Sequence, residues 1–495
     1  MKNIIFFIII TTVVYSKTFW SDPIQISEDA QWPEAMIGYP EIIVDNNGHI
    51  HAFWSKSFQI EPGSLNWYSQ IEYSKSNDGG NTWSEIENLT SDYNSKRICE
   101  IKAVCDSNNN IHLTYGRAYN PPIDDIYYMV YNGKEWTIPE IIVNSMYDMY
   151  LKMEISNSDI VYLVWNSGYY GALKYIDLKN DNPNWSDIFF LSEDDYYIKN
   201  ISIDQNDDLY AIGTSNFYDQ ANHTYINRPY LFKFDIDSIA WTKIEEIGSY
   251  KEEVRGRAIV VNGNDLYINI SVGPTMGDNI IEHLESDNTN IEWSAPYNYG
   301  SNNNWDCEMY KDNNDFLHLF EKHYYEVNNP EGITGLIHSI GKNGIWETTV
   351  IDSSEDYSYS NPRVTYDIKN DMNYLVYGKF DRINDIGKIY FHSKLNDTSI
   401  EEYSAIPNET VLFQNYPNPF NNETVIPYKL KENSEVEINI YNLKGELVKI
   451  VKQGFQYKGT YKYKLKVNEM STGIYYYSLK IGNTTTGIRK MLYLK

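Results

Sequence analysis

A seven-fold internal repeat is the feature of this 495-residue sequence that most constrains its fold. Each copy has a turn rich in Asp and Asn followed by an apolar strand, and six copies end in a run that begins with Trp. Successive Trp positions are 49 to 56 residues apart. Self-similarity at a fixed period indicates an array of one supersecondary unit. The turns begin at Asp45, Asp106, Ser156, Asp204, Asn262, Asp312 and Asp367, and the Trp positions are Trp83, Trp136, Trp185, Trp241, Trp293 and Trp346.

The ends of the repeat array predict a closed ring. The seventh repeat stops after residues 388–393 without its Trp strand, and an orphan Trp strand at 20–27 precedes the first repeat. A ring of four-stranded blades closes without an exposed edge if that orphan strand completes the last blade. An open stack would need dedicated caps instead. We therefore predict an all-β fold with a seven-bladed β-propeller over residues 17–395; a six-bladed ring is the alternative if one repeat is misread.

The N-terminus has the pattern of a signal peptide over residues 1–16. Lys2 precedes an apolar run at 4–14, and Val14 and Ser16 provide the small-residue cleavage pattern. The run is shorter than the roughly 20 residues that a membrane-spanning helix needs. No other apolar stretch reaches that length, so we expect export and no transmembrane segment in the mature chain.

Charge divides the chain into unlike parts. The whole sequence has 41 basic and 68 acidic side chains, and a net charge of −27 argues against nucleic-acid binding. Residues 17–411 contain 27 basic and 62 acidic side chains, whereas 412–495 contain 13 and 6. Residues 396–411 are polar, include Pro407 and are typical of a linker. Three cysteines are too few for a disulfide scaffold.

Residues 412–495 predict a separate domain with its own address. Alternating apolar and polar runs of five to eight residues favour a small Ig-like β-sandwich. The motifs at 416–420, 440–445, 473–476 and 490–495 resemble, in order, those of the type A sorting domain of the type IX secretion system. That resemblance implies a secreted or cell-surface cargo whose partner is the outer-membrane translocon. An ordinary accessory β-domain is the alternative.

One turn of the first repeat resembles the Asp box (BNR repeat) of sialidase-like propellers. Asp78 can cap backbone N–H groups, the neighbouring glycines can take positive φ, and Trp83 can pack between blades. In that class the motif lies on the outer rim, so it indicates fold and not catalysis. Its residues here are Ser76, Asp78, Gly80, Thr82 and Trp83.

Two further patterns suggest metals but have a simpler explanation. His51, His112 and His318 occupy one repeat position where the other copies have Tyr, so a shared hydrogen-bonding role explains them. The Asp/Asn turns lack the Gly and Glu of an EF-hand loop, and such residues favour ordinary turns. We predict no metal site and no cofactor, with a structural calcium ion in these turns as the alternative.

Charged residues mark the strand before each turn, which should be the innermost strand of its blade. Unpaired burial of these groups is costly, so they must contact each other, water or a ligand. Mixed signs suit a sugar acid held by an Arg fork, while a hydrated, self-neutralised channel mouth explains them equally. The candidate ligand-binding residues are Glu41, Lys102, Lys152, Lys199, Arg255, Arg257, Asp306, Glu308 and Arg363.

Three functions are compatible with this pattern. The leading hypothesis is a secreted propeller that binds glycans or a surface partner, helped by insertions at 54–69, 215–228 and 322–335 that are rich in Tyr, Asn and Trp. The second is a carbohydrate-active enzyme, either a sialidase-like hydrolase or a polysaccharide lyase. Arg97, Arg255 or Arg257, and Arg363 could supply the three arginines of a sialidase, but its Arg-Ile-Pro motif is missing. The third is an interaction scaffold without a small ligand.

Overall fold

The computed structural model shows a molecule whose regular elements, within the described residues, are all β-strands. The described residues are 20–61, 63, 67–90, 96–118, 123–168, 170–191, 196–219, 224–247, 254–262, 265–272, 280–287, 297–301, 307–325, 333–342, 345–354, 356–396, 410–413, 415, 418, 420–421, 423–431, 434–456, 459–466, 470–482 and 484–493. The predicted signal peptide and most of the predicted linker lie outside them.

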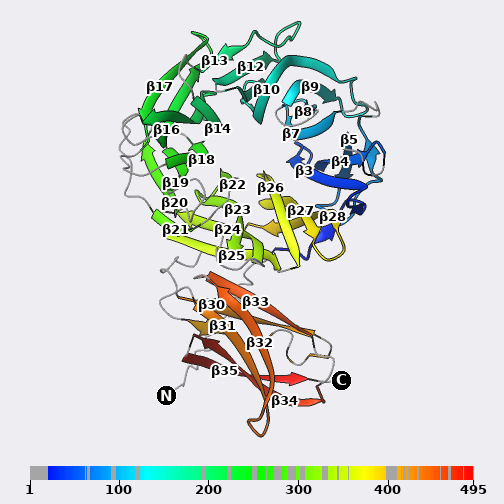
Figure 1. Ribbon diagram of the computed structural model, residues 1–495, viewed down its shortest axis with the longest axis vertical. Helices are drawn as coiled ribbons and strands as arrows, with labels where there is room; N and C mark the ends of the chain where they lie inside the picture. Colours follow the sequence, from blue (N-terminus) through cyan, green and yellow to red (C-terminus); the bar gives the residue numbers. More distant parts are fainter. Residues whose placement is uncertain are drawn as a thin grey trace, which may run out of the picture.

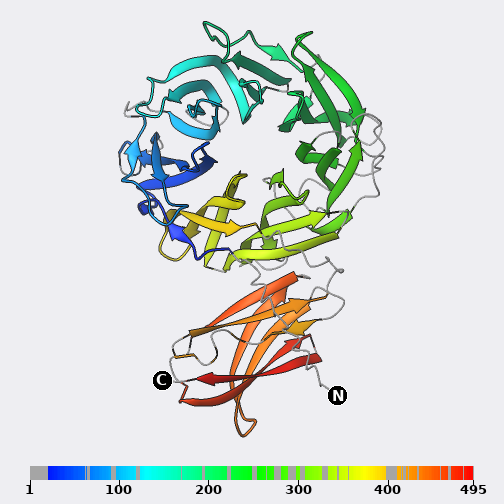
Figure 2. The ribbon, with the colours of Figure 1, turned by 180° about the vertical axis from the view of Figure 1, so that it is seen from behind.

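The repeats form antiparallel sheets that are arranged in a ring, and the C-terminal strands lie beside the ring (Figures 1 and 2). The first sheet contains β3 (Ala35–Val44), β4 (Ile50–Gln59), β5 (Trp67–Ser76) and β6 (Glu87–Asn88). The next contains β7 (Arg97–Cys105), β8 (Ile111–Ala118), β9 (Ile123–Tyr131), β10 (Glu140–Ile155), β11 (Ile160–Ser167), β12 (Tyr170–Asp177) and β13 (Phe189–Phe190). The long strand β10 pairs with β9 through its first part and with β11 through its last part, and so joins two repeats.

The later repeats continue the same order around the ring. One sheet contains β14 (Tyr196–Ile203), β15 (Leu209–Asp219), β16 (Thr224–Asp235) and β17 (Ala240–Glu246). Another contains β18 (Val254–Asn262), β19 (Asp265–Val272), β20 (Ile280–Asp287) and β21 (Tyr297–Ser301). A third contains β22 (Cys307–Lys311), β23 (Leu317–Tyr325), β24 (Ile333–Lys342) and β25 (Ile345–Ser354). The last repeat contributes β26 (Tyr357–Asp367), β27 (Met372–Asp381) and β28 (Ile386–Leu395).

The N-terminal segment closes the ring, as the sequence predicts. In β1 (Ile24–Gln25), Ile24 pairs with Phe391 of β28, and in β2 (Ala30–Gln31), Ala30 pairs with Gly387. The Ser21 N–H also donates to the Ser393 carbonyl at 2.7 Å. Each inner strand contacts the next one in the series β3, β7, β10, β14, β18, β22 and β26, and β26 contacts β3. The predicted closure between the first and last repeats is therefore confirmed.

Two of the outer Trp segments, those of Trp20 and Trp83, are shorter strands than the sequence suggests. The orphan segment predicted at 20–27 is a strand only at β1, and the run that begins at Trp83 is a strand only at β6. The Trp83 ring instead packs against Phe391 of the last sheet, with ring centroids 5.0 Å apart. Packing of the Trp83 indole between neighbouring sheets therefore fixes that segment, whereas Trp241 and Trp346 lie within β17 and β25 and pair with Phe234 and Gly341.

The Asp-box turn has the contacts that were expected of it. Asp78 Oδ1 accepts the Thr82 N–H at 2.9 Å, and Asp78 Oδ2 accepts the Thr82 hydroxyl at 2.6 Å. The Ser76 hydroxyl accepts the Gly80 N–H at 2.8 Å. Gly80 has φ +91° and lies against Phe391, where a Cβ would overlap the ring. The capping, the positive φ and the packing of Trp83 are all confirmed, and they place this turn in the interface between the first and last sheets.

The C-terminal strands form a second packed unit. One sheet has the order β32 (Leu447–Gln456), β31 (Ser434–Asn442), β34 (Gly473–Ile481) and β35 (Thr484–Tyr493). The other contains β29 (Val411–Leu412), β30 (Glu423–Leu430) and β33 (Gly459–Lys466). Apolar side chains from both sheets form one buried cluster that includes Ile426, Ile438 and Leu479. Strand β33 also has a parallel pairing with β25 of the ring, at Thr460 and Thr349.

Candidate functional site

All seven inner strands line one cavity of about 710 Å³ on the axis of the ring. Each inner strand runs from what we call the entry end of the ring towards its Asp/Asn turn. Because antiparallel partners reverse direction, the hairpins β4–β5, β15–β16 and β23–β24 lie at the entry end, and these hairpins contain the three predicted insertions. The axial cavity is thus positioned by the repeat, and its surroundings at the entry end vary from copy to copy.

The repeat sets which side chains face the axis. Alternate residues of a strand share a face, so residues four and two positions before each turn lie on the same side. Residues two positions before the turn include Glu154, Ser202, Tyr310 and Thr365, and all of them line the cavity. Each inner strand also has one residue located four positions before its turn. In chain order these residues are Glu41, Lys102, Lys152, Asn200, Ala258, Glu308 and Arg363.

We call the ring of residues four positions before the turns the charged level, because most of them are charged. A β-bulge precedes this level in six of the seven inner strands. The pairing register shifts between Gly38 and Glu41, for example, and the other five shifts occur at equivalent places in β7, β10, β14, β18 and β26. Three residues at these bulges have left-handed backbones, namely Tyr39, Glu100 and Tyr150. A bulge redirects the side chains that follow it and is common at binding sites. The repeated bulge therefore orients the charged level of the ring.

One group of charges in the site is internally paired. The Lys102 ammonium donates to Glu41 at 2.6 Å, and Arg363 lies 2.9 Å from Glu308 and 3.7 Å from Glu41. Burial raises the pKa of Glu41 and lowers that of Lys102, while their mutual attraction opposes both shifts. Burial also acts to raise the pKa of Glu308, but the charges of Arg363, Lys152 and Lys102 outweigh it and hold the pKa below its ordinary value. Glu41, Lys102, Glu308 and Arg363 therefore form a self-neutralised network, which is one of the two explanations that the sequence analysis offered.

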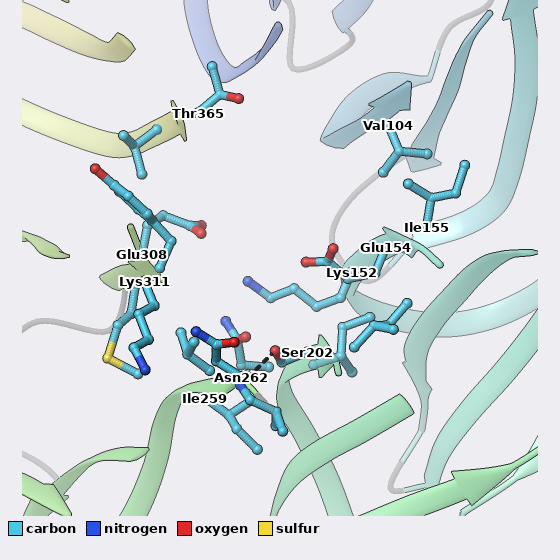
Figure 3. Close-up of a pocket in the computed structure, with 18 of the residues that line it drawn as sticks. Val104, Lys152, Glu154, Ile155, Ser202, Ile259, Asn262, Glu308, Lys311 and Thr365 are labelled. Atoms are coloured by element: carbon cyan, nitrogen blue, oxygen red, sulfur yellow. Dashed lines mark hydrogen bonds between the residues drawn. The ribbon is translucent and has the colours of Figure 1, made fainter. Parts of the chain in front are cut away.

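A second group of polar side chains lines the cavity without such pairing. Within the described part of the chain, the side chains of Lys152, Glu154 and Asn200 make no hydrogen bond or ion pair. Lys152 and Glu154 extend from β10 towards the middle of the cavity, and Glu308 approaches from the opposite side (Figure 3). The Tyr310 hydroxyl is buried and has no hydrogen-bond partner among the described residues. Lys152, Glu154 and Asn200 are half-buried and face the cavity, so their polar groups are accessible to a ligand or to water.

Glu154 has the most informative titration in this group. Burial, and then the charge of Glu308, raise its pKa to about 7, although Lys152 and Lys102 oppose the shift. Near neutral pH its carboxyl is therefore present in both protonated and ionised forms, and the protonated form can donate a hydrogen bond to a ligand. Ser202 differs from Glu154 because its hydroxyl already accepts the Val261 N–H at 3.0 Å (Figure 3).

Several predicted site residues do not line the cavity. Lys199 lies 4.5 Å from the ring centre of Tyr150, and Arg257 is buried near Glu321 and Cys307. Both precede their turn by five residues, so the alternation of the strand directs them away from the axis. The same rule, counted back from each turn, would have found Glu154, Asn200 and Tyr310, which the sequence prediction missed. Asp306 and the side chain of Arg255 lie outside the described residues.

The arginines proposed for a sialidase do not gather at one point. Arg97 contacts Met36 Sδ at 3.7 Å and lies 5.8 Å from the Trp67 ring centre, whereas Arg363 contacts the axial carboxylates. The three-arginine arrangement is therefore not formed by these two residues.

The histidines of the repeat bridge a turn to a neighbouring ring. His51 contacts the Tyr73 hydroxyl at 2.8 Å and Asp45 at 3.5 Å, and His112 contacts Tyr128 at 2.6 Å and Asp106 at 3.3 Å. Burial lowers the pKa of His51, so the ring is neutral at pH 7. Within the described residues no group of three His, Cys, Asp or Glu side chains is arranged to hold a metal ion. The prediction that no metal or cofactor binds, and the calcium alternative, stay untested.

Comparison with known proteins identifies the C-terminal domain. Residues 414–493 match the family model described as the secretion system C-terminal sorting domain. The predicted sorting domain is thus confirmed, and it marks the chain as a cargo of the type IX secretion system that is exported to the cell surface or beyond. Among the described residues no helix is long and apolar enough to cross a membrane.

Comparison with solved structures gives similarities at low sequence identity. A protein of unknown function from Dyadobacter fermentans aligns with TM-score 0.43 at 12% identity, covering 76% of this chain and 99% of that one. The NanB sialidase of Streptococcus pneumoniae, as its K499G mutant, gives 0.41 at 12%, covering 75% and 70%. A polysaccharide lyase described as an ulvan lyase gives 0.39 at 11%, covering 71% and 78%. No curated protein showed a match to this sequence. None of these TM-scores reaches 0.5, so the relatives do not define an activity for this chain.

Proposed function

We propose that this protein is an exported β-propeller that binds an acidic glycan in its axial cavity. The observation that carries the proposal is the division of the cavity into paired and unpaired groups. Glu41, Lys102, Glu308 and Arg363 neutralise one another, whereas the side chains of Lys152, Glu154 and Asn200 face the same space without a hydrogen bond or ion pair to the described residues. A network that served only to fill the channel would have paired these groups as well.

The repeat supports a finer description of the fold. Seven inner strands that contact one another in sequence order support seven blades, if the long sheet is divided at β10. The Asp-box turn supports a place among sialidase-like propellers. We propose a propeller over residues 17–395, a linker over 396–411 and an Ig-like sorting domain over 412–495, with a signal peptide at 1–16.

The unpaired groups define the chemistry of the ligand. The Lys152 ammonium faces the cavity without an ion pair to the described residues, and it suits a carboxylate or sulfate. The Asn200 amide, which faces the cavity, suits ring hydroxyl groups. A cavity of about 710 Å³ has room for more than one sugar ring.

Binding to a glycan array by the full-length secreted protein tests the proposal. We expect Lys152→Ala to weaken binding of acidic glycans roughly tenfold or more, because the variant loses a charge-assisted contact. Lys199→Ala is the matched control, since it removes the same charge from a residue outside the cavity. Equal affinity of the Lys152 variant and the parent protein would refute the proposal. If a broad panel shows neither binding nor turnover, the interaction scaffold is favoured instead.

One observation favours a second function, that of a glycoside hydrolase. Glu154 and Glu308 line the same cavity, and their pKa values are displaced in opposite directions. Two carboxyl groups in different protonation states are the requirement for acid and base catalysis of glycoside hydrolysis. Glu154 would give its proton to the leaving oxygen as the glycosidic bond breaks, and Glu308 would take a proton from the water that attacks the sugar carbon.

Hydrolase and lyase assays on the glycans that bind distinguish this enzyme from a binding protein. The hydrolase function requires turnover that Glu154→Gln abolishes and that declines above pH 7, because the acid then loses its proton. Arg363→Ala should also abolish turnover by disturbing Glu308. Binding without any turnover would leave the lectin-like function.

A further inference from the structure

An aromatic stack lies at the entry end of the ring, away from the axial cavity. Trp32 and Trp67 have ring centroids 5.7 Å apart at an interplanar angle of 15°, and Arg97 lies 5.8 Å from the Trp67 ring centre. Trp67 is buried, whereas Trp32 is 43% exposed and is the most exposed tryptophan among the described residues. A single exposed apolar residue is ordinary, but an exposed indole supported by a second, parallel indole is a preformed flat surface.

The backbone of the stack is held in place from several elements. The Trp32 N–H donates to the Asp385 carbonyl at 2.8 Å, and the Gln31 side chain donates to the Asn384 carbonyl at 2.9 Å. Both acceptors belong to the turn between β27 and β28. Trp67 is the first residue of β5 and Arg97 the first residue of β7, so strand pairing fixes both. The indole surface therefore costs little conformational entropy when a ligand contacts it.

The position of the stack relates it to the axial site. Arg97 precedes Lys102 by five residues on the same inner strand, which corresponds to roughly 16 Å along β7. A single sugar in the cavity cannot reach that far, whereas a chain of several sugars leaving through the entry end can. The apolar face of a pyranose ring stacks on Trp, and hydroxyl or carboxylate groups at the ring edge can reach the Arg97 guanidinium.

We propose that Trp32, supported by Trp67 and Arg97, is an outer sugar subsite, so that the ligand is an oligosaccharide or polysaccharide chain. This inference rests on the proposed glycan-binding function of the axial cavity, and it adds the length of the ligand. The axial groups hold an acidic sugar of the chain, and the Trp32 surface holds a sugar further along it.

Affinity as a function of chain length tests the outer subsite. The probe is an array of acidic oligosaccharides in graded lengths, from uronate-containing and sulfated polysaccharides, presented to the full-length protein. We expect affinity to rise with length, Trp32→Ala to weaken the long chains roughly tenfold and leave the short ones unchanged, and Trp32→Phe to retain most of the gain. Ile383→Ala is the matched control, because Ile383 is 70% exposed in the β27–β28 turn. Equal thermal midpoints of the variants show that folding is intact.

The outcomes separate the two proposals. If Lys152→Ala weakens every length and Trp32→Ala weakens none, the outer subsite is refuted and the axial site stands. If Lys152→Ala weakens none, the axial site is refuted, and the outer subsite as an extension of it fails as well. Equal loss of short and long chains in Trp32→Ala would also refute the outer subsite, since a short chain in the cavity cannot reach it. If Trp32→Ala also lowers the thermal midpoint, Trp32→Phe becomes the deciding variant. The outer subsite then requires Trp32→Phe to restore both the thermal midpoint and the increase of affinity with chain length.

Discussion

The ring and the sorting domain are both built from antiparallel strands, yet they fill their centres in opposite ways. The sorting domain buries Ile426, Ile438 and Leu479 between two sheets. The ring places its apolar residues between neighbouring sheets and surrounds its axis with charged ones. The difference follows from geometry, because two stacked sheets meet face to face, whereas inner strands around an axis leave a space that polar groups can line.

The two regions also differ in what their charge achieves. Residues 17–411 carry a net charge of −35, from 27 basic and 62 acidic side chains, and residues 412–495 carry +7, from 13 and 6. Acidity of the ring supports solubility outside the cell. The sorting domain serves export.

The largest difference between the regions should appear when ring closure is removed. Deletion of residues 20–31 removes β1 and β2 and leaves β28 as an open edge with Phe391 and Ile389 exposed. We expect the thermal transition of the ring to be lost and the protein to aggregate, because an unpaired apolar edge strand recruits other chains. A deletion variant with the parent thermal transition and a monomeric elution profile would contradict this.

Ion pairs in the two regions should differ strongly in energy. Arg363→Ala leaves Glu41 and Glu308 without their shared cation, and we expect it to lower the free energy of unfolding by about 3–5 kcal/mol. Lys480 lies 3.5 Å from Glu437 on the sorting domain, and Lys480→Ala should cost about 0–1 kcal/mol because that pair is open to solvent. Denaturant titration measures both. Equal costs would mean that the axial network is as solvated as the outer surface.

Glu154 should make the stability of the ring depend on pH. Its folded-state pKa of about 7 lies above the ordinary value of 4.5, so the folded state binds more protons between these values. The stabilisation is complete below pH 4.5 and is lost as the pH rises through 7, by up to about 3 kcal/mol. Glu154→Gln should flatten the unfolding free energy over this interval relative to the parent protein. Parallel pH profiles for parent and variant would contradict the assigned shift.

The smallest expected effect separates backbone strain from packing within the ring. Gly80 and Gly133 both have positive φ, at +91° and +86°, but only Gly80 lies against another side chain. Gly133→Ala should cost about 1 kcal/mol for the backbone alone, and Gly80→Ala should cost about 1–3 kcal/mol more because its methyl group overlaps Phe391. Urea denaturation measures the difference. Equal costs would show that the Asp-box turn can move away from the last sheet.

The sequence predicted the position of the site along the inner strands better than it predicted the individual residues that line it. The repeat identified the inner strands, and Glu41, Lys102, Lys152 and Glu308 all line the cavity as expected. Lys199 was wrongly included and Asn200 was missed, although they are neighbours in the chain. Lys199 was selected by its charge alone, whereas the two-residue period of a strand selects Asn200. Neutral residues such as Asn200 and Tyr310 carry no signal of their own and are found only by their position before the turn.

The sequence by itself determined the repeat, the closure of the ring by its N-terminal strand, the Asp-box turn and the export signal of the C-terminal domain. Each of these depends on local turn chemistry, on periodicity or on a short motif. Only the tertiary structure decided which axial charges pair and which remain available. Arg363 contacts Glu41 and Glu308, which lie on different strands and are far apart in the chain. Coulomb attraction and desolvation change over a few ångströms, so the partners of a charge are fixed only when the closed ring sets those distances.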